Sequence, residues 1–296
     1  MKRNFLKILS LLLISALLLV FSSCSDNSNK NTEAESSFMQ TDSDDENITE
    51  QSDAEESEEE KPIYVSALVK ESFFDEFSVC CKVCEYFYDL QGRVSVIKEY
   101  DGFENPVSVR TNEYNAENLI CREIKKDRSG DITEITETEY DEKNRKTLVT
   151  VKNGKDEILH TVEHIYKEDG SSCALYKDRN GKITKKALFG TDCLVFTEEE
   201  YTSDGSIIKT DYIYSDDSVL ANERKYYNGE FKYELLYNYE NLKLQSVIFK
   251  DKDGELIKKR LYGYDIYGNN IIVTEENAIS VPLFKRISEY RTEIKK

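Results

Sequence analysis

The sequence is poor in the residues that most often mark an active site. Its 296 residues contain two histidines and no tryptophan. They show neither a Gly-x-Ser-x-Gly nucleophile elbow nor a glycine-rich phosphate loop. The absence of tryptophan also argues against a carbohydrate-binding platform, which needs large amphipathic rings. We therefore expect a protein that is not an enzyme and needs no cofactor, with an enzyme whose site is assembled only by folding as an open alternative.

The two histidines, His160 and His164, lie in the segment His-Thr-Val-Glu-His. If this segment is a strand, four residues span about 13 Å, which is too far for both side chains to bind one metal ion. We predict that both are surface residues of a sheet and that the chain has no metal site.

Seven cysteines are present, and the one at position 24 belongs to a targeting segment. The pair Cys81-x-x-Cys84 has no second pair at metal-binding spacing, and on a strand its two side chains point to opposite faces. We expect plain cysteines on the faces of a sheet, with disulfides or a metal or redox site as open alternatives. The cysteines concerned are Cys80, Cys81, Cys84, Cys121, Cys173 and Cys193.

The N-terminus has the pattern of an export signal. Three cationic residues precede an apolar run of 14 residues from Ile8 to Phe21, which is shorter than the roughly 20 residues of a membrane-spanning helix. The cut site Phe21-Ser22-Ser23-Cys24 resembles the lipobox of bacterial lipoproteins, although Phe21 stands where that family usually has leucine. The resemblance implies lipidation of Cys24 and a membrane anchor, since two or more acyl chains hold stably. An ordinary secretory signal and an uncleaved anchor are the alternatives.

Residues 25–60 are acidic and nearly free of apolar side chains. They contain 14 Asp or Glu residues against one lysine, Lys30. Such a segment cannot offset its own chain entropy, so we expect a disordered spacer, with a tail for a cationic partner as the alternative. Residues 61–296 carry a further net charge of −8. Acidity of this kind opposes binding to nucleic acid, which needs clusters of Lys and Arg.

An aromatic residue followed by a turn recurs at a nearly constant interval through the rest of the chain. The interval is roughly 25 residues, and such a period indicates one supersecondary unit copied many times. Its members are Tyr88, Tyr114, Tyr140, Tyr166, Phe189, Tyr214, Tyr239, Tyr264 and Tyr290. Because each aromatic accompanies a turn, we predict a structural role for these tyrosines, with a binding row for a sugar or a protein as the alternative.

A second series of turns lies between the aromatic ones and ends on glycine. Asn-Gly and Asp-Gly between β-forming residues are strong hairpin signals, because both residues accept positive φ. The same turn chemistry explains the Asp-rich steps that end at Gly181 and Gly254, which lack the frame of a calcium loop. The glycines of the series are Gly102, Gly130, Gly154, Gly181, Gly205, Gly229 and Gly254.

The segments between the turns alternate as strands do. Ile208, Thr210, Tyr212 and Tyr214 share one face, and with only three prolines in the chain the ladders are rarely interrupted. We predict an all-β fold, an antiparallel meander of tandem hairpins. Some 17 or 18 strands exceed what a flat sheet accommodates, so we expect one long twisted or coiled sheet.

The unit resembles the YD repeat of the RHS family. The resemblance is fullest in Tyr88-Asp-Leu-Gln-Gly-Arg-Val94 and Tyr264-Asp-Ile-Tyr-Gly-Asn-Asn270, and Tyr140-Asp-Glu-Lys-Asn-Arg145 matches with Asn in place of Gly. It covers roughly residues 64–295. It implies a hairpin-repeat fold and, as one alternative function, an accessory or immunity-type relative of a toxin-delivery shell. The repeat phase also places a turn at Asp75-Glu76, between strands at 64–73 and 77–88.

The sequence thus divides into three parts. They are a signal peptide at 1–23, a lipidated cysteine with a disordered acidic linker at 24–61, and a domain of about nine tandem hairpin repeats at 62–296. We expect a lipid-anchored protein on the extracytoplasmic face of the cell membrane. Its β-repeat sheet would serve non-catalytic binding or envelope structure, with a protein or an envelope polymer as the partner and no nucleic acid. An envelope enzyme remains the third alternative.

Overall fold

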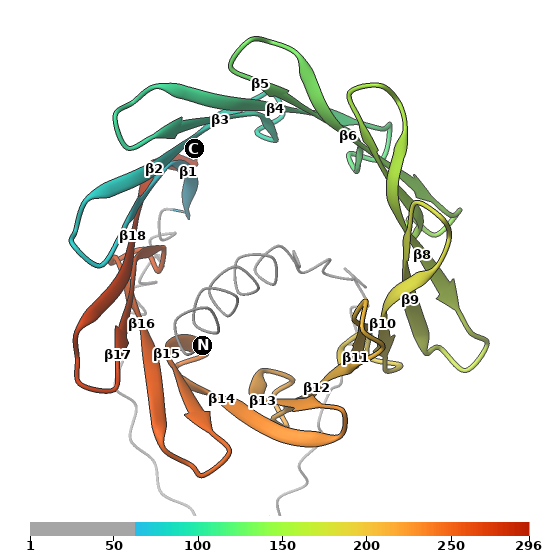
Figure 1. Cartoon of the computed structure of the whole chain (residues 1–296). Coiled ribbons are helices and arrows are strands. Elements are labelled where there is room, and N and C mark those ends of the chain that lie inside the picture. The colour runs from blue at the N-terminus through green and yellow to red at the C-terminus, as the bar shows by residue number, and fades with distance from the viewer. Residues whose placement is uncertain (1–62, 296) are drawn as a thin grey trace, which may run out of the picture. The chain divides into compact units, whose positions relative to one another are not determined.

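The computed structural model describes residues 63–295, which lie within one compact unit of the chain, residues 59–296. These residues form 18 strands and, within the described range, no helix (Figure 1). The predicted all-β fold of antiparallel hairpins is confirmed. The strands are β1 (Ile63–Phe74), β2 (Cys80–Tyr88), β3 (Val94–Asp101), β4 (Pro106–Tyr114), β5 (Ile120–Asp127), β6 (Ile132–Tyr140), β7 (Lys146–Asn153), β8 (Ile158–Tyr166), β9 (Ser172–Asp178), β10 (Ile183–Phe189), β11 (Val195–Tyr201), β12 (Ile207–Tyr214), β13 (Leu220–Tyr227), β14 (Glu230–Glu240), β15 (Lys243–Asp251), β16 (Leu256–Tyr264), β17 (Asn270–Asn277) and β18 (Pro282–Lys295).

The sheet closes on itself. Each strand pairs with the next in antiparallel fashion, and β1 also pairs with β18 over eleven residue pairs. Ser66 Oγ and Thr292 Oγ1 lie 2.8 Å apart across this seam, and the rings of Phe73 and Phe284 are 6.2 Å apart. The prediction of one long twisted or coiled sheet is therefore corrected, since the strands form a closed ring (Figure 1).

The closure has a physical cause in the repeated hairpin. Most strand pairs contain a register shift next to a turn, for example between Phe87 and Tyr88 opposite Val96 and Val94. A bulge of this kind bends its strand and increases the local twist. Because the same bend recurs in the same place in successive hairpins, it accumulates in one direction until the two end strands meet.

One turn geometry recurs at both ends of the ring. In the turn from Asp89 to Arg93, the Asp89 amide donates to the Arg93 carbonyl at 2.9 Å, and the Gly92 amide donates to the Asp89 carbonyl at 3.0 Å. The Asp89 carboxylate also accepts from the amides of Gln91 and Arg93, at 2.9 Å each. The fourth residue takes a positive φ, +77° at Gly92. An Asp or Asn at the first position thus supplies the bonds that shape the turn.

Two glycines of the second turn series have a different role from the predicted one. Gly102 and Gly154 are the second residues of their turns, and the positive φ belongs instead to Glu104 and Asp156. A Cβ on Gly102 would lie 1.8 Å from the Cys80 carbonyl oxygen, and one on Gly154 would lie 1.7 Å from that of Ile132. These glycines allow a close approach of two backbones, which is the other use of glycine.

The two faces of the sheet differ in burial. Residues opposite each other in a ladder point to the same face, so the strand registers assign every strand residue to one of two faces. One face holds nine of the ten buried hydrophobic residues, and only Ile135 lies on the other. The nine are Cys84, Val151, Val162, Ala174, Ala187, Leu235, Val247, Phe249 and Val273.

The more buried face is the concave one. Side chains converge on the concave side of a curved sheet and spread apart on the convex side. Rings of this strand number are too wide for their own side chains to fill, so burial comes from neighbours along the wall.

Candidate functional site

The aromatic series lies at one end of the ring and ties successive turns together. The hydroxyl of Tyr140, at the end of β6, donates to the carbonyl of Ile120, the first residue of β5, at 2.8 Å. Each such bond reaches the preceding aromatic turn, except that of Tyr88, the first of the series, which reaches Leu68 within β1. The same tie joins Tyr88 to Leu68 (2.6 Å), Tyr114 to Val94 (2.8 Å), Tyr166 to Lys146 (2.9 Å) and Tyr264 to Leu244 (2.8 Å).

A cation from the preceding turn covers the tyrosine ring in several of these ties. The guanidinium carbon of Arg145 lies 3.9 Å from the ring centre of Tyr166, and that of Arg93 lies 4.2 Å from the ring of Tyr114. Arg145 Nε also donates to Asp141 at 2.8 Å, and bonds from the side chain and backbone of Arg145 hold the pKa of that carboxyl below its usual value. One turn therefore carries the arginine, its carboxylate partner and the carbonyl that the next tyrosine binds.

The ties are not complete around the ring. Phe189 occupies the tyrosine position at the end of β10 and has no hydroxyl, and it packs against the buried cluster of Val162, Ala174 and Ala187. The hydroxyls of Tyr214, Tyr239 and Tyr290 make no such tie to a residue that the structure describes. The aromatic ring is thus common to all repeats, and the hydrogen bond is not.

A second kind of tyrosine lies further inside, on the concave face. Tyr212 donates its hydroxyl to Glu198 Oε2 at 2.8 Å, and Tyr86 donates to Glu71 Oε2 at 2.5 Å. Tyr237 donates to Glu223 Oε1 in the same way. Sequence reasoning missed these pairs. The available signal is a Glu followed by a Tyr at a sequence separation of 14 or 15, which places the two on one face of one hairpin.

Burial changes the acid–base chemistry of these pairs. It raises the pKa values of Tyr212 and Tyr237, and the neighbouring carboxylates raise them further. It also raises the pKa of Glu223, against the hydrogen bond from Tyr237 and the charge of Lys225. The phenols therefore stay protonated as donors, and each holds a carboxylate in place.

Ion pairs complete the polar part of the concave face. Glu275 accepts from Lys258 Nζ at 2.9 Å and from Arg260 Nη2 at 2.8 Å, and all three side chains are largely buried. The two cations also lie over the ring of Phe249, at 4.5 and 5.8 Å. They lower the pKa of the Glu275 carboxyl, although burial opposes them. These ion pairs hold the charged side chains in fixed positions on the concave face.

The histidines and cysteines do not gather into a centre. The exposed His160 and the half-buried His164 lie on β8, and burial together with the charge of Lys146 lowers the pKa of His164. None of the six described cysteines forms a disulfide, and burial raises the thiol pKa of Cys84. Within residues 63–295, no group of three His, Cys, Asp or Glu side chains is placed to hold a metal ion.

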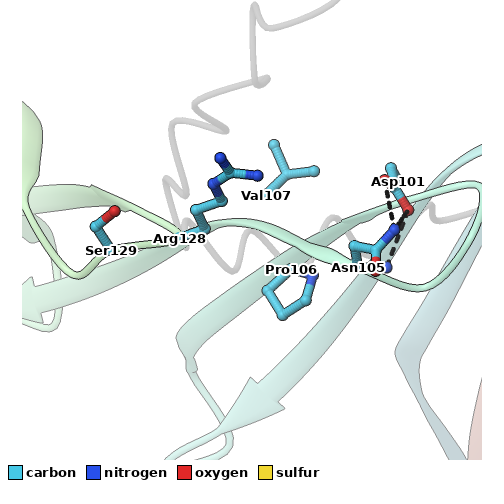
Figure 2. A pocket seen from close by; sticks show the side chains of 6 residues that line it. All are labelled: Asp101, Asn105, Pro106, Val107, Arg128 and Ser129. Carbon is cyan, nitrogen blue, oxygen red and sulfur yellow. Dashed lines mark hydrogen bonds between the residues drawn. The ribbon is translucent and has the colours of Figure 1, made fainter.

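A shallow pocket lies at the other end of the ring, between the β3–β4 and β5–β6 turns (Figure 2). Its polar wall is already occupied, since both oxygens of Asp101 accept bonds from the side-chain amide of Asn105. The apolar wall is made by Pro106 and Val107, and Arg128 faces it from the next hairpin (Figure 2).

The proposed lipidation site Cys24 and the acidic linker lie outside the described residues. Within the described range, no helix is long and apolar enough to cross a membrane.

Comparisons with known proteins give distant similarities only. No protein-family model and no curated protein matches the chain. The crystal structure of TcdB2-TccC3-Cdc42 is similar at 11% identity and a TM-score of 0.33, over 71% of this chain. This chain spans only 14% of that one.

Porin-like proteins are also among the similar structures. The one from Bacteroides uniformis ATCC 8492 has 11% identity and a TM-score of 0.40, and the match covers 76% of this chain and 98% of that chain. The one from Bacteroides vulgatus ATCC 8482 has 10% identity and a TM-score of 0.27, with the same coverage. Because all these TM-scores are below 0.5, no function is transferred from these proteins.

Proposed function

We propose that this protein is a lipoprotein of the extracytoplasmic face of the cell membrane, and that its closed repeat ring is a non-catalytic binding module. Cys24 bears the lipid, and residues 25–60 separate the ring from the membrane. The proposal for the N-terminus rests on the sequence: the cationic start, the short apolar run and the small residues before Cys24.

The pairing of the ionisable groups on the concave face is the observation that supports a binding role. Glu198, Glu223 and Glu275 each have a tyrosine, lysine or arginine partner. A reaction needs a nucleophile or a base that is free to meet a substrate, and groups that hold one another suit a rigid surface instead. The structure supports presentation of a shaped polar wall.

The convex face supports a ring that is hydrated on both sides. Lys152 and Glu137 form an ion pair there at 2.8 Å, and Lys177 and Glu163 form another at 2.5 Å. A sheet face in contact with lipid is apolar over a band about 25 Å tall, and charges in that band are destabilising. The convex charges therefore favour a ring in water, held near the membrane by its lipid.

Membrane fractionation of a Cys24→Ser variant tests the anchor. We expect the wild-type chain to sediment with membranes and to carry acyl chains on its N-terminal cysteine by mass spectrometry. The variant should lose the acyl chains and leave the membrane fraction after export, while the ring keeps its circular dichroism spectrum. Unmodified Cys24 in the wild-type protein would refute the anchor and leave the binding role to be tested separately.

We also infer kinship with YD-repeat proteins, on the strength of the repeated unit. The Asp-led turn and the tie from the tyrosine that directly precedes it recur in the three segments that most resemble the repeat, at Tyr88, Tyr140 and Tyr264. A role as an accessory or immunity-type relative of a toxin-delivery shell is then the second candidate. Rescue of cells from a toxin carried by such a shell would support it, and unchanged killing would refute it.

A further inference from the structure

Three neighbouring hairpins expose large apolar side chains at the end of the ring opposite the tyrosine ties. The central residues of the turns after β1, β3 and β17 are Phe77, Phe103 and Ile279, which are 77%, 88% and 80% exposed. Val79 and Val281, the last residues of two of these turns, are about half exposed. We call these five residues the seam patch, because they lie on either side of the β1–β18 seam.

Closure of the ring is what brings the patch together. Phe77 follows the first strand and Ile279 precedes the last, so the two are far apart in the sequence. Because β18 pairs with β1 and β2 pairs with β3, the three turns follow one another along the same end of the sheet. Successive hairpins are two strands apart, so neighbouring tips lie about 10 Å from one another.

The patch is local. Five other turns at the same end of the ring have a polar residue at the matching position, and they are built with the same backbone geometry. These residues are Ser129, Lys155, Asn180, Asp204 and Asp253. The turn geometry therefore does not require an apolar residue at the centre of the turn. Phe77, Phe103 and Ile279 are each at least 77% exposed, so packing against the ring does not explain them either. Contiguous exposed apolar groups rimmed by polar ones mark interaction sites.

The rim of the patch is acidic, and this selects the partner. Asp75 and Glu76 border Phe77, and Asp101 and Glu104 border Phe103. The cations nearest the patch lie on its strands, where Lys82 pairs with Glu99 at 3.2 Å and Lys285 lies over the Phe74 ring, and Arg128 of the adjoining hairpin lines the shallow pocket beside Val107. A second copy of the chain would bring the same four carboxylates against this rim. The acidic linker and an anionic lipid surface carry the same unfavourable sign.

We propose that the seam patch docks a protein segment that is apolar at its centre and basic around it. The apolar side chains of that segment would cover Phe77, Phe103 and Ile279, and its Lys or Arg residues would meet the carboxylates of Glu76 and Glu104. The shallow pocket beyond Phe103, with Pro106 and Val107 as its apolar wall, extends the surface that such a segment would contact (Figure 2).

This inference deepens the proposed binding role and does not depend on the lipid anchor. A failure of docking at the patch leaves the fractionation of the Cys24→Ser variant unaffected. Conversely, an unlipidated chain could still dock the segment.

Fluorescence of a single introduced tryptophan tests the proposal, because the natural chain contains none. Phe103→Trp in the full chain places the reporter at the patch, and Asn180→Trp places a matched reporter at a polar tip of the same end. The probe is a synthetic amphipathic peptide of leucine and lysine without tryptophan, and a leucine and glutamate peptide of equal length is its control. Should Phe103→Trp alter the circular dichroism spectrum, Phe77→Trp replaces it.

We expect the lysine peptide to shift the emission of the Phe103→Trp protein to shorter wavelength and to leave the Asn180→Trp protein nearly unchanged. Adding Glu76→Lys and Glu104→Lys should weaken the apparent affinity about tenfold, as expected for two surface charge contacts. The glutamate peptide should give no shift.

Four results would overturn the proposal. Equal shifts at both reporters would show non-specific attraction to an acidic protein. A shift that phosphatidylcholine vesicles produce and the peptide does not would show a membrane surface instead. A shift that depends on the concentration of the protein alone would show self-association. An absence of any shift at Phe103→Trp would show that the patch does not dock such a segment.

Discussion

The concave face of the ring is built differently in two arcs. From β7 to β10 it is apolar, with Val162, Ala174 and Ala187 at its centre and Phe189 against them. From β11 to β17 the same face also has buried apolar residues, Leu235, Val247, Phe249 and Val273, but it adds buried ion pairs and tyrosine–carboxylate pairs. The backbone ladders and the turns are alike in both arcs, so the repeat tolerates two different ways of burying side chains.

The contrast also bears on the role of the tyrosine tie, the hydrogen bond from a tyrosine hydroxyl to a backbone carbonyl of the neighbouring turn. Phe189 replaces the tyrosine in the apolar arc, where packing against Ala187 and Val162 covers the ring. Tyr140 and Tyr264 lie outside that arc, and each binds a backbone carbonyl of the neighbouring turn. Tyr166, within the apolar arc, keeps its bond to the Lys146 carbonyl, so the hydrogen bond at the rim and the apolar cluster below it occur side by side and only Phe189 lacks the bond there.

The largest loss of stability should come from removing one buried charge from the polar arc, the part of the concave face from β11 to β17. Glu275→Ala leaves Lys258 and Arg260 buried without their shared carboxylate, so we expect the free energy of unfolding to fall by about 3 kcal/mol. Urea denaturation followed by circular dichroism measures it. Glu289→Ala is the control, since Glu289 is exposed and 3.9 Å from Lys70, and it should cost less than about 1 kcal/mol. Equal losses in the two variants would contradict the account of the polar arc.

The stability of the apolar arc, from β7 to β10, should depend on side-chain volume and not on charge. Ala187 is 1% exposed, and Ala187→Leu forces a larger side chain into the cluster, so we expect a loss of about 2 kcal/mol in the same assay. Ala116→Leu, in an exposed turn, should change little. If Ala187→Leu left stability unchanged, the cluster would not be packed as described.

The tyrosine tie should contribute less than either arc. Tyr140→Phe removes the bond to the Ile120 carbonyl, and we expect a loss of about 1 kcal/mol. Tyr239→Phe is the matched control, because its hydroxyl makes no tie of this kind among the described residues, and it should be nearly neutral. A larger loss for Tyr239→Phe than for Tyr140→Phe would refute the role of the tie.

The two arcs should also differ in the direction of a small pH effect. His164 has a lowered pKa in the folded ring, so the unfolded chain binds more protons below about 6.5 and stability falls as the pH drops through that value. Glu223 has a raised pKa, so its cost to stability is absent below 4.5 and appears as the pH rises through its folded pKa. Comparing the wild type with His164→Gln and with Glu223→Gln in urea from pH 4.5 to 8 measures each contribution. Two differences with the same sign of pH dependence would contradict the assignment.

The local structure could be predicted from the sequence because it depends on short segments. The period of the aromatics and glycines located the hairpins, and the phase placed the first turn at Asp75-Glu76, where the structure has a turn from Asp75 to Val79. The alternation of Ile208, Thr210, Tyr212 and Tyr214 gave the correct shared face, as the registers of β12 show. These features follow from turn chemistry and from the two-residue period of a strand.

Closure and the polar pairs could not be predicted in the same way. Whether the ring closes depends on the total of the small bends that all the hairpins contribute. A local sequence pattern does not determine that total. The pairing of Glu223 with Tyr237 depends on the register of one hairpin, which a bulge shifts by one residue: Glu71 and Tyr86 are 15 apart and Glu198 and Tyr212 are 14 apart. The seam patch exists only because the ring closes, so it could not be predicted from the sequence either.

Hydrogen exchange at the seam tests the closed ring most directly. Followed by mass spectrometry on the wild-type protein, peptides from β1 over Lys70–Phe74 and from β18 over Pro282–Glu289 should be as protected as peptides from β4 and β5 in the wall. In an open sheet these segments are edge strands, and about half of their amides face water. Fast exchange of β1 and β18 beside a protected β4 and β5 would contradict closure, and with it the seam patch.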